Sequence, residues 1–143
     1  MNLSWEDNDH NVDWHEASVL YKIAPMGDKH PDDLQTSFGN SLYKCFVFHQ
    51  TQLVGIGRAL ADGVDCSYLC DIAVHPDYQG YGIGKGIIEK LTERSKGHRK
   101  IILYAAPGKE AFYKKFGFKR MSTAMAIFKD HDNALNTGLI NEI

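Results

Sequence analysis

The chain lacks the features of a membrane or secreted protein. None of its apolar runs approaches the roughly 20 residues that a helix needs to cross a bilayer. Residues 1–7 have neither the basic stretch nor the apolar core of a signal peptide. Cysteine is scarce, with three residues in no metal-ligand pattern. We therefore expect a cytoplasmic protein without a metal, in which Cys66 and Cys70 are small buried thiols rather than redox or metal groups.

Repeats, low-complexity tracts and linkers are also absent. A length of 143 residues suits one domain, and 43% hydrophobic residues can fill a core. We expect a single domain over residues 1–143, in which 130–143 form a tail, a strand or a dimer element. Patterns of apolar residues, turns and caps predict helices and a mixed α/β sheet. The predicted strands are 3–6, 43–50, 52–61, 67–75, 100–105, 118–121 and 122–128, and the predicted helices are 12–23, 31–39, 82–96 and 107–117.

A large net charge is missing too, since the total is −2, but the charges are unevenly spread. Residues 1–40 hold eight acidic residues and two lysines, whereas residues 79–120 hold eleven basic and three acidic residues. The basic block favours an anionic ligand, and the acidic block would attract a cationic amine. Ordinary solvated surface charge is the alternative for both.

What the sequence does have is a glycine-rich loop, Gln79-Gly80-Tyr81-Gly82-Ile83-Gly84. It follows a strand-like run and precedes an amphipathic helix. Backbone N–H groups at a helix start, together with the positive end of the helix dipole, form an anion site. Glycine suits that place because a Cβ would keep a phosphate away from the backbone. The loop therefore predicts a phosphate-bearing ligand.

Two familiar phosphate loops do not fit this spacing. Lys85 is followed by Gly86 instead of Ser or Thr, which excludes a P-loop, and no G-x-G-x-x-G is present. The pattern Q-x-x-G-x-G resembles the coenzyme A pyrophosphate loop of the GNAT superfamily of N-acetyltransferases. A second signature of that family, Ala111-Phe112-Tyr113-Lys114-Lys115-Phe116-Gly117-Phe118, follows in the family's order and separation. The resemblance covers residues 42–129.

The resemblance implies a GNAT-like α/β fold: a mixed, mostly antiparallel sheet with helices on both faces and a splayed central strand pair. It implies an acetyl-CoA-dependent N-acetyltransferase that moves the acetyl group directly to a primary amine. Lys85 is either near the phosphates or a solvated helix residue. The cofactor-binding residues implied are Ile72, Ala73, Val74, Gln79, Gly80, Tyr81, Gly82, Ile83, Gly84, Lys85 and Phe112.

The same resemblance implies catalytic roles. Tyr113 is the expected general acid for the departing thiolate, with a packed aromatic as the alternative. A backbone N–H at or near Val74 would bind the oxyanion. Asp71, an acid inside an apolar strand, is the candidate general base. Alternatively, Asp71 is a structural carboxylate, or ordered water removes the proton. Weaker candidates for the base are Tyr68, His75, His49 and His30.

The acceptor side is predicted from residues in the early, acidic part of the chain. They could form an apolar or cation–π wall beside a protonated amine, or belong to the core. These residues are Trp14, Tyr21, Met26, Phe38 and Tyr43. Residues 119–128 are similar to small bacterial amine acetyltransferases, including arylalkylamine and diamine acetylators. The expected acceptor is therefore a small diamine, polyamine or arylalkylamine.

Two other functions stay open. One is acetylation of a protein lysine or N-terminus, and the other is a non-catalytic acyl-CoA-binding sensor. Nucleic acid is not expected as a partner, because a coenzyme explains the basic block and the isoelectric point is 6.4. No membrane partner is expected, and a homodimer is compatible with the family. No Cys or Ser stands in a nucleophile setting, so a covalent acetyl-enzyme is not expected.

Overall fold

The computed structural model describes residues 1–142 and divides the chain into two compact units, residues 1–103 and the part that begins at Tyr104. Each unit is described by itself. The expectation of one domain over residues 1–143 stays a prediction beside this division. No helix among the described residues is long and apolar enough to cross a membrane.

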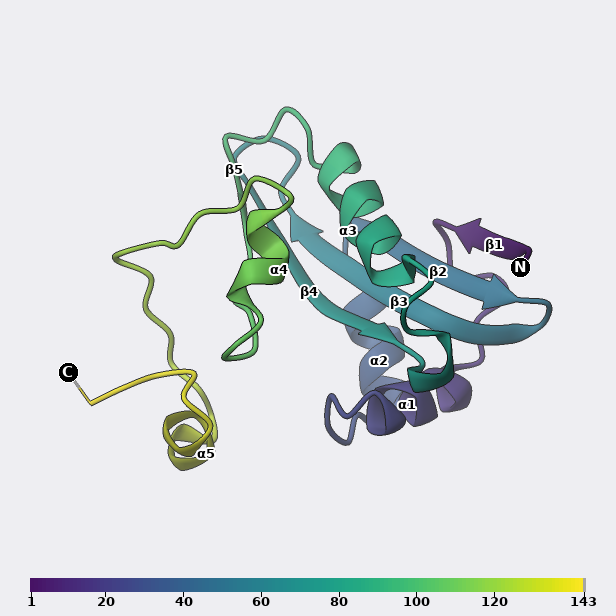
Figure 1. Ribbon diagram of the computed structural model, residues 1–143, viewed down its shortest axis with the longest axis horizontal. Coiled ribbons are helices and arrows are strands. Elements are labelled where there is room, and N and C mark those ends of the chain that lie inside the picture. Colours follow the sequence, from purple (N-terminus) through teal and green to yellow (C-terminus); the bar gives the residue numbers. More distant parts are fainter. Residues whose placement is uncertain (143) are drawn as a thin grey trace. The chain divides into compact units, whose positions relative to one another are not determined.

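The first unit is built on a five-stranded sheet of mostly antiparallel strands (Figure 1). The strands are β1 (Leu3–Glu6), β2 (Tyr43–His49), β3 (Gln52–Ala61), β4 (Cys66–Val74) and β5 (Lys100–Ile102). They follow one another in chain order across the sheet, and the β4–β5 pair alone is parallel. The predicted mixed sheet is thereby confirmed, although the fifth strand ends three residues earlier than expected.

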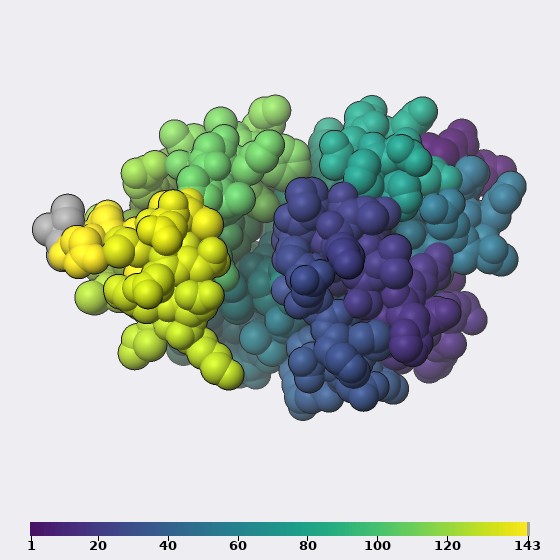
Figure 2. All heavy atoms as spheres, turned by 90° about the horizontal axis from the view of Figure 1, so that it is seen from below, coloured from purple at the N-terminus to yellow at the C-terminus, as the bar shows by residue number. Residues whose placement is uncertain are grey.

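Helices cover both faces of this sheet (Figure 1). On one face lie α1 (Trp14–Ile23), which Asp13 caps, and α2 (Pro31–Gly39), which begins at a proline. Figure 2 shows these two helices spread over that face. On the other face lies α3 (Ile83–Arg94), preceded by a short 3₁₀ helix (Pro76–Tyr78).

The residues behind these helices alternate along the strands, as strand geometry requires. Phe46, Ile56 and Ala73 join the apolar cluster under α1 and α2. On the opposite face, the backbone at Gly57 approaches α3 so closely that a Cβ there would lie 2.7 Å from the side chain of Ile87. The sheet therefore separates two packing layers.

The central strands β4 and β5 splay apart. Their pairing runs only from Cys66 opposite Lys100 to Tyr68 opposite Ile102, while β4 continues to Val74. Within the described residues, the second half of β4 thus has no strand beside it on the β5 side. This is the splayed pair that the family resemblance implied.

The second unit has two short helices, α4 (Glu110–Lys114) and α5 (His131–Asn136). The predicted strands 118–121 and 122–128 are wrong, since residues 118–128 contain no strand. Met125 and Ile127 are about fully exposed, at 96% and 102%. A strand needs hydrogen-bonding partners, and within this unit the segment has none to pair with. The predicted helix over 107–117 shortens to α4, and Ile143 lies outside the described residues.

Candidate active site

The glycine-rich loop adopts the form that its sequence predicts. Gly80 and Gly82 have φ of 87° and 78°, a left-handed conformation that suits glycine. Gly82 is the N-cap of α3, and no side chain caps the helix. The first helical hydrogen bond runs from the N–H of Gly86 to the carbonyl of Gly82, at 3.0 Å. The N–H groups of residues 83–85 therefore stand ready for an anion.

The side chains around this loop differ in their availability to a cofactor. Ile83 is buried, so it can contribute only its backbone. Tyr81 is exposed, as are Gln79 and Lys85. The ammonium of Lys85 lies 3.8 Å from a carboxylate oxygen of Glu89, which is an ordinary surface pair along a helix.

The end of β4 offers another backbone donor. The N–H of His75 donates to the carbonyl of Val54 on β3, at 2.8 Å. Successive N–H groups of a strand point to opposite sides, so the N–H of Val74 points away from β3. That is the side from which β5 has diverged. This geometry supports the expected oxyanion donor, whereas the side chain of Ala73 is buried in the core and that of Ile72 faces Gly57.

Asp71 occupies a β-bulge in the middle of β4. Arg58 pairs with Cys70 and Ile56 pairs with Ala73, so two residues of β4, Asp71 and Ile72, face one residue of β3. Asp71 has a φ of 56°, a left-handed conformation that aspartate tolerates better than most residues. The bulge places its carboxylate on the α1–α2 face.

Two cations hold that carboxylate. Arg58 Nε donates to one oxygen of Asp71 at 2.8 Å, and the ammonium of Lys29 lies 3.5 Å from the other oxygen. The exposed fractions of the Arg58 and Asp71 side chains are 14% and 19%, so water screens the pair little. Arg58 also donates from Nη1 to the hydroxyl of Ser41, at 3.2 Å. The carboxylate expected as a base is therefore the centre of an ion-pair cluster.

The protonation of the neighbours follows from the same packing. Burial, and then the Asp71 carboxylate, raise the pKa of Tyr21 well above its ordinary value. The Tyr21 hydroxyl therefore keeps its proton, which it donates to the carbonyl of Asp71 at 2.6 Å. Burial opposes the charge on Arg58, but Cys70 and Asp71 outweigh it and raise the pKa of Arg58. Arg58 is charged at every physiological pH.

The structure does not gather the five predicted acceptor residues into one wall. Tyr21 and Phe38 are fully buried, and Trp14 packs on Phe38 with ring centroids 5.4 Å apart. Tyr43 projects from the other face of the sheet, where its ring meets that of His98. Met26 is exposed between α1 and α2. This arrangement favours the core interpretation for Tyr21 and Phe38 and for the partly buried Trp14, and it leaves Met26 on the segment that also carries Lys29.

Tyr113 and Phe112 lie on α4 in the second unit. Their rings are 5.2 Å apart, and Phe112 also meets Phe116, while Tyr113 packs against Phe118. Burial raises the pKa of Tyr113, which keeps the phenol protonated. No hydrogen bond from the described residues engages its hydroxyl, so the proton is available to a ligand.

The other candidate groups have structural partners. His49 Nδ1 lies 2.7 Å from the hydroxyl of Tyr78, and His75 accepts from the N–H of Asp77. Cys66 and Cys70 are half-buried rather than buried. Among the described residues, no group of three His, Cys, Asp or Glu side chains could hold a metal ion.

Sequence reasoning missed Lys29, Ser41 and Arg58. One signal was present: Arg58 is the single charged residue of the apolar stretch 52–61. A charged side chain in such a strand requires a partner or a ligand, by the same argument that singled out Asp71. Lys29 binds the same Asp71 carboxylate but comes from the segment between α1 and α2, and no local pattern shows that the two cations meet there.

Comparison with known proteins now identifies the class. Residues 24–128 match the model of the acetyltransferase (GNAT) domain family, well over half of the chain. The chain belongs to this family. In structure it is similar to a probable acetyltransferase from meticillin-resistant Staphylococcus aureus, with a TM-score of 0.77 and 24% identity over 89% of this chain and 99% of that one. A Clostridium acetobutylicum acetyltransferase solved with acetyl-CoA has a TM-score of 0.66 and 18% identity, over 89% of this chain and 96% of that one.

In sequence the chain is similar to an uncharacterized N-acetyltransferase (ycf52-like) from Prochlorococcus marinus, 32% identical over 91 residues. That match covers 59% of this chain and 51% of the relative. It is also similar to a rice protein named serotonin N-acetyltransferase 2, chloroplastic, 36% identical over 89 residues, which are 59% of this chain and 44% of the relative. The chain thus spans about half the length of the curated relatives it matches.

Proposed function

We propose that the protein transfers an acetyl group from acetyl-CoA directly to a primary amine. One observation carries this proposal. The helix α3 starts without a side-chain cap in a loop of left-handed glycines, and this loop follows β4, whose second half has no strand of the described chain beside it on the β5 side. The loop supplies N–H donors for the pyrophosphate, and the open strand supplies backbone groups for the rest of the coenzyme. Membership of the GNAT family supports the assignment.

In the proposed reaction, the amine nitrogen forms a bond to the thioester carbon and the carbon–sulfur bond breaks. The N–H of Val74 stabilises the oxyanion of the tetrahedral intermediate. Tyr113 then gives its proton to the departing thiolate, a role for which its raised pKa keeps it protonated. The proton lost by the amine goes to ordered water or to Asp71. Both Asp71 oxygens face cations, so Asp71 can take the proton only when one ion pair opens.

The acceptor is a small primary amine, and the arylalkylamine class has more support than the diamine class. The rice relative carries the name of a serotonin acetyltransferase, and serotonin is an arylalkylamine. Three of the eight acidic residues that would attract a diamine are engaged elsewhere: Asp13 caps α1, Glu16 accepts from the N–H of Leu53, and Asp7 pairs with Arg94. A cytoplasmic location stays a prediction, since the rice relative is named chloroplastic.

The test is release of free thiol from acetyl-CoA with a panel of arylalkylamines, diamines, amino acids and lysine peptides. We expect turnover with small amines. Turnover confined to peptides would redirect the proposal to a protein substrate, and acetyl-CoA binding without turnover would indicate a sensor.

The variant Tyr113→Phe sharpens this test. Loss of a general acid should lower kcat by about 100-fold while the affinity for acetyl-CoA changes less than about twofold. An equal loss in both parameters, or an unchanged kcat, would remove Tyr113 from the mechanism.

A further inference from the structure

The cluster around Asp71 has more positive than negative charge. Lys29 and Arg58 both contact the Asp71 carboxylate, and a third cation, Lys44, donates to the carbonyl of Ser41 at 2.9 Å. Ser41 in turn accepts from Arg58. Two cations therefore contact one carboxylate, and a third contacts the neighbouring Ser41, in a half-buried place where charges are normally balanced.

Lys29 and Arg58 also have N–H groups that make no hydrogen bond within the described chain. A guanidinium has five N–H groups, and within the described chain Arg58 uses one on Asp71 and one on Ser41. The Lys29 ammonium has a single ion pair, at 3.5 Å, and 29% of its side chain is exposed. Half-buried N–H donors of charged groups need partners, so Lys29 and Arg58 can bind an anion from outside the protein.

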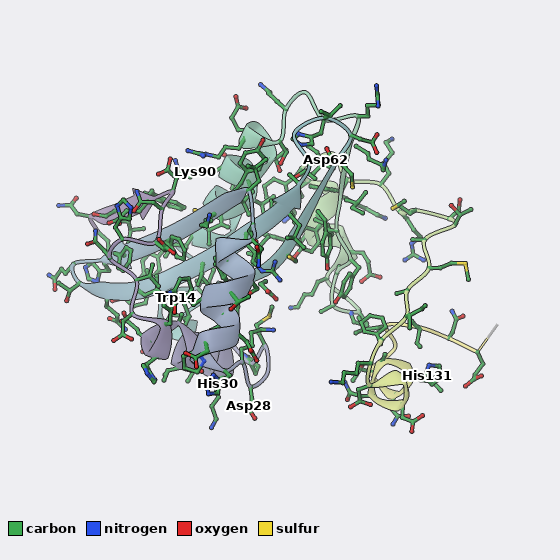
Figure 3. The ribbon with its side chains drawn as sticks, turned by 180° about the vertical axis from the view of Figure 1, so that it is seen from behind. Trp14, Asp28, His30, Asp62, Lys90 and His131 are labelled. Atoms are coloured by element: carbon green, nitrogen blue, oxygen red, sulfur yellow. The ribbon has the colours of Figure 1, made fainter. Side chains whose placement is uncertain are left out.

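The cluster lies on the same strand as Val74, the proposed oxyanion donor. Asp71 lies three residues before Val74 on the same strand, and the cluster is on the face opposite α3, whose glycine loop holds the coenzyme in the proposed function. Lys29 belongs to the segment that joins α1 to α2, from which Asp28 and His30 point outward (Figure 3).

That segment is held in position rather than loosely attached. The hydroxyl of Ser18 on α1 donates to the carbonyl of Lys29 at 2.6 Å. The Lys29 ammonium lies 5.5 Å from the centre of the Tyr21 ring, a cation–π contact. Arg58 likewise lies 5.8 Å from the centre of the Phe38 ring. Both positive groups are thus oriented in advance, which reduces the entropy lost on binding.

We propose that Lys29 and Arg58 bind an oxyanion, a carboxylate or a phosphate, carried by the acceptor amine. This inference rests on the proposed acetyl transfer and revises its acceptor: a primary amine with an acidic group is preferred over the plain arylalkylamine that the name of the rice relative suggests. Asp71 orients the two cations, and the amine end of the acceptor extends toward Val74. Arginine suits this role because its planar fork matches both anions.

Matched acceptors test the proposal. Putrescine and 4-aminobutanoate differ only in the group at the far end, an ammonium or a carboxylate; tyramine and tyrosine differ only by the carboxylate. We expect kcat/KM at least about tenfold higher for the acidic member of each pair, the effect of one hydrogen bond to a charged group. β-Alanine against O-phosphoethanolamine then distinguishes carboxylate from phosphate. A preference for putrescine and tyramine would overturn the proposal.

A variant ties the effect to the cluster. Lys29→Gln keeps the Arg58–Asp71 pair and should raise KM for the acidic acceptors about tenfold, while KM for tyramine changes less than about twofold. Lys22→Gln, the same change at an exposed site on α1, is the control and should alter neither. Equal effects of Lys29→Gln on tyrosine and tyramine would contradict the proposal while leaving acetyl transfer intact. No turnover with any amine would instead defeat the proposed function itself.

Discussion

On the α3 side of the sheet, the candidate ligand donors are backbone N–H groups of consecutive residues, whereas on the α1–α2 side they are side chains from separate elements. Residues 83–85 supply the first set. Lys29 and Arg58 supply the second, from the α1–α2 segment and β3. A backbone site is specific to a chemical group that many substrates share, such as a pyrophosphate. A side-chain site can change with one substitution, so it suits the variable acceptor.

The two sides also differ in how their ion pairs are screened. The pair between Arg58 and Asp71 is half-buried, while the pair between Arg94 and Asp7, beside α3, has side chains 44% and 56% exposed. Water and salt weaken the second pair far more than the first. The charges near the acceptor are therefore part of the structure, and those beside α3 are ordinary surface charges.

The largest effect expected from this contrast is on stability. Arg58→Met removes the hydrogen-bonded partner of the half-buried Asp71 carboxylate and leaves only Lys29 beside it, and we expect a loss of about 3 kcal/mol in the free energy of unfolding. Arg94→Met, which breaks the exposed pair, should cost below about 1 kcal/mol. Urea denaturation measures both.

The double variant Arg58→Met/Asp71→Asn gives the check. Asparagine tolerates the left-handed φ of position 71, so removing both charges should recover most of the loss. Equal costs for Arg58→Met and Arg94→Met, or a double variant no better than the single one, would show that the two pairs are equivalent.

A smaller effect concerns pH, because each face holds one thiol with a shifted pKa. Burial raises the pKa of Cys45, on the α3 face, and of Cys70, beside Arg58, from 9.0 to about 11. Below pH 9 the thiol is protonated in both the folded and the unfolded chain, and the stability linked to its raised pKa is fully present. As the pH rises through 11, the unfolded state ionises first and stability falls. For the well-buried Cys45 the loss is about 2 kcal/mol by pH 11.

Cys45→Ala should therefore flatten the fall in unfolding free energy between pH 8.5 and pH 11, measured by urea denaturation at each pH. Cys70→Ala should flatten it less, since Cys70 is more exposed to water. A pH profile that neither substitution alters would mean that other groups control alkaline unfolding.

The smallest effect expected is at the glycine loop. Gly82→Ala forces a left-handed alanine at φ 78° and places a Cβ near the anion site; the affinity for acetyl-CoA should fall about tenfold. Gly63→Ala imposes a similar strain at φ 85° in the β3–β4 turn and has the same open surroundings. Calorimetric titration should show normal acetyl-CoA binding for that control. If both variants bind acetyl-CoA like the parent, the loop is not the cofactor site.

Local patterns predicted most of the first unit. The strand ranges 3–6, 43–50 and 52–61 agree with β1, β2 and β3 within one residue at each end, because alternation and turns are visible over a few neighbours. The strands expected over 118–128 were wrong because pairing between strands is not visible in a few neighbouring residues. Their composition suits a strand, but a strand also requires a partner to pair with, and composition does not supply one.

By itself, the sequence determined the glycine loop, the order of the helices and strands of the first unit along the chain, and the family, because each depends on residues that are neighbours in the chain. Only the tertiary structure decided that Asp71 meets Lys29 and Arg58, since these residues come together through a bulge, a strand pairing and a loop far apart in the sequence. The burial of Tyr21 and Phe38 was decided in the same way. Backbone geometry is local, whereas the balance of charges in a half-buried site depends on every element packed around it.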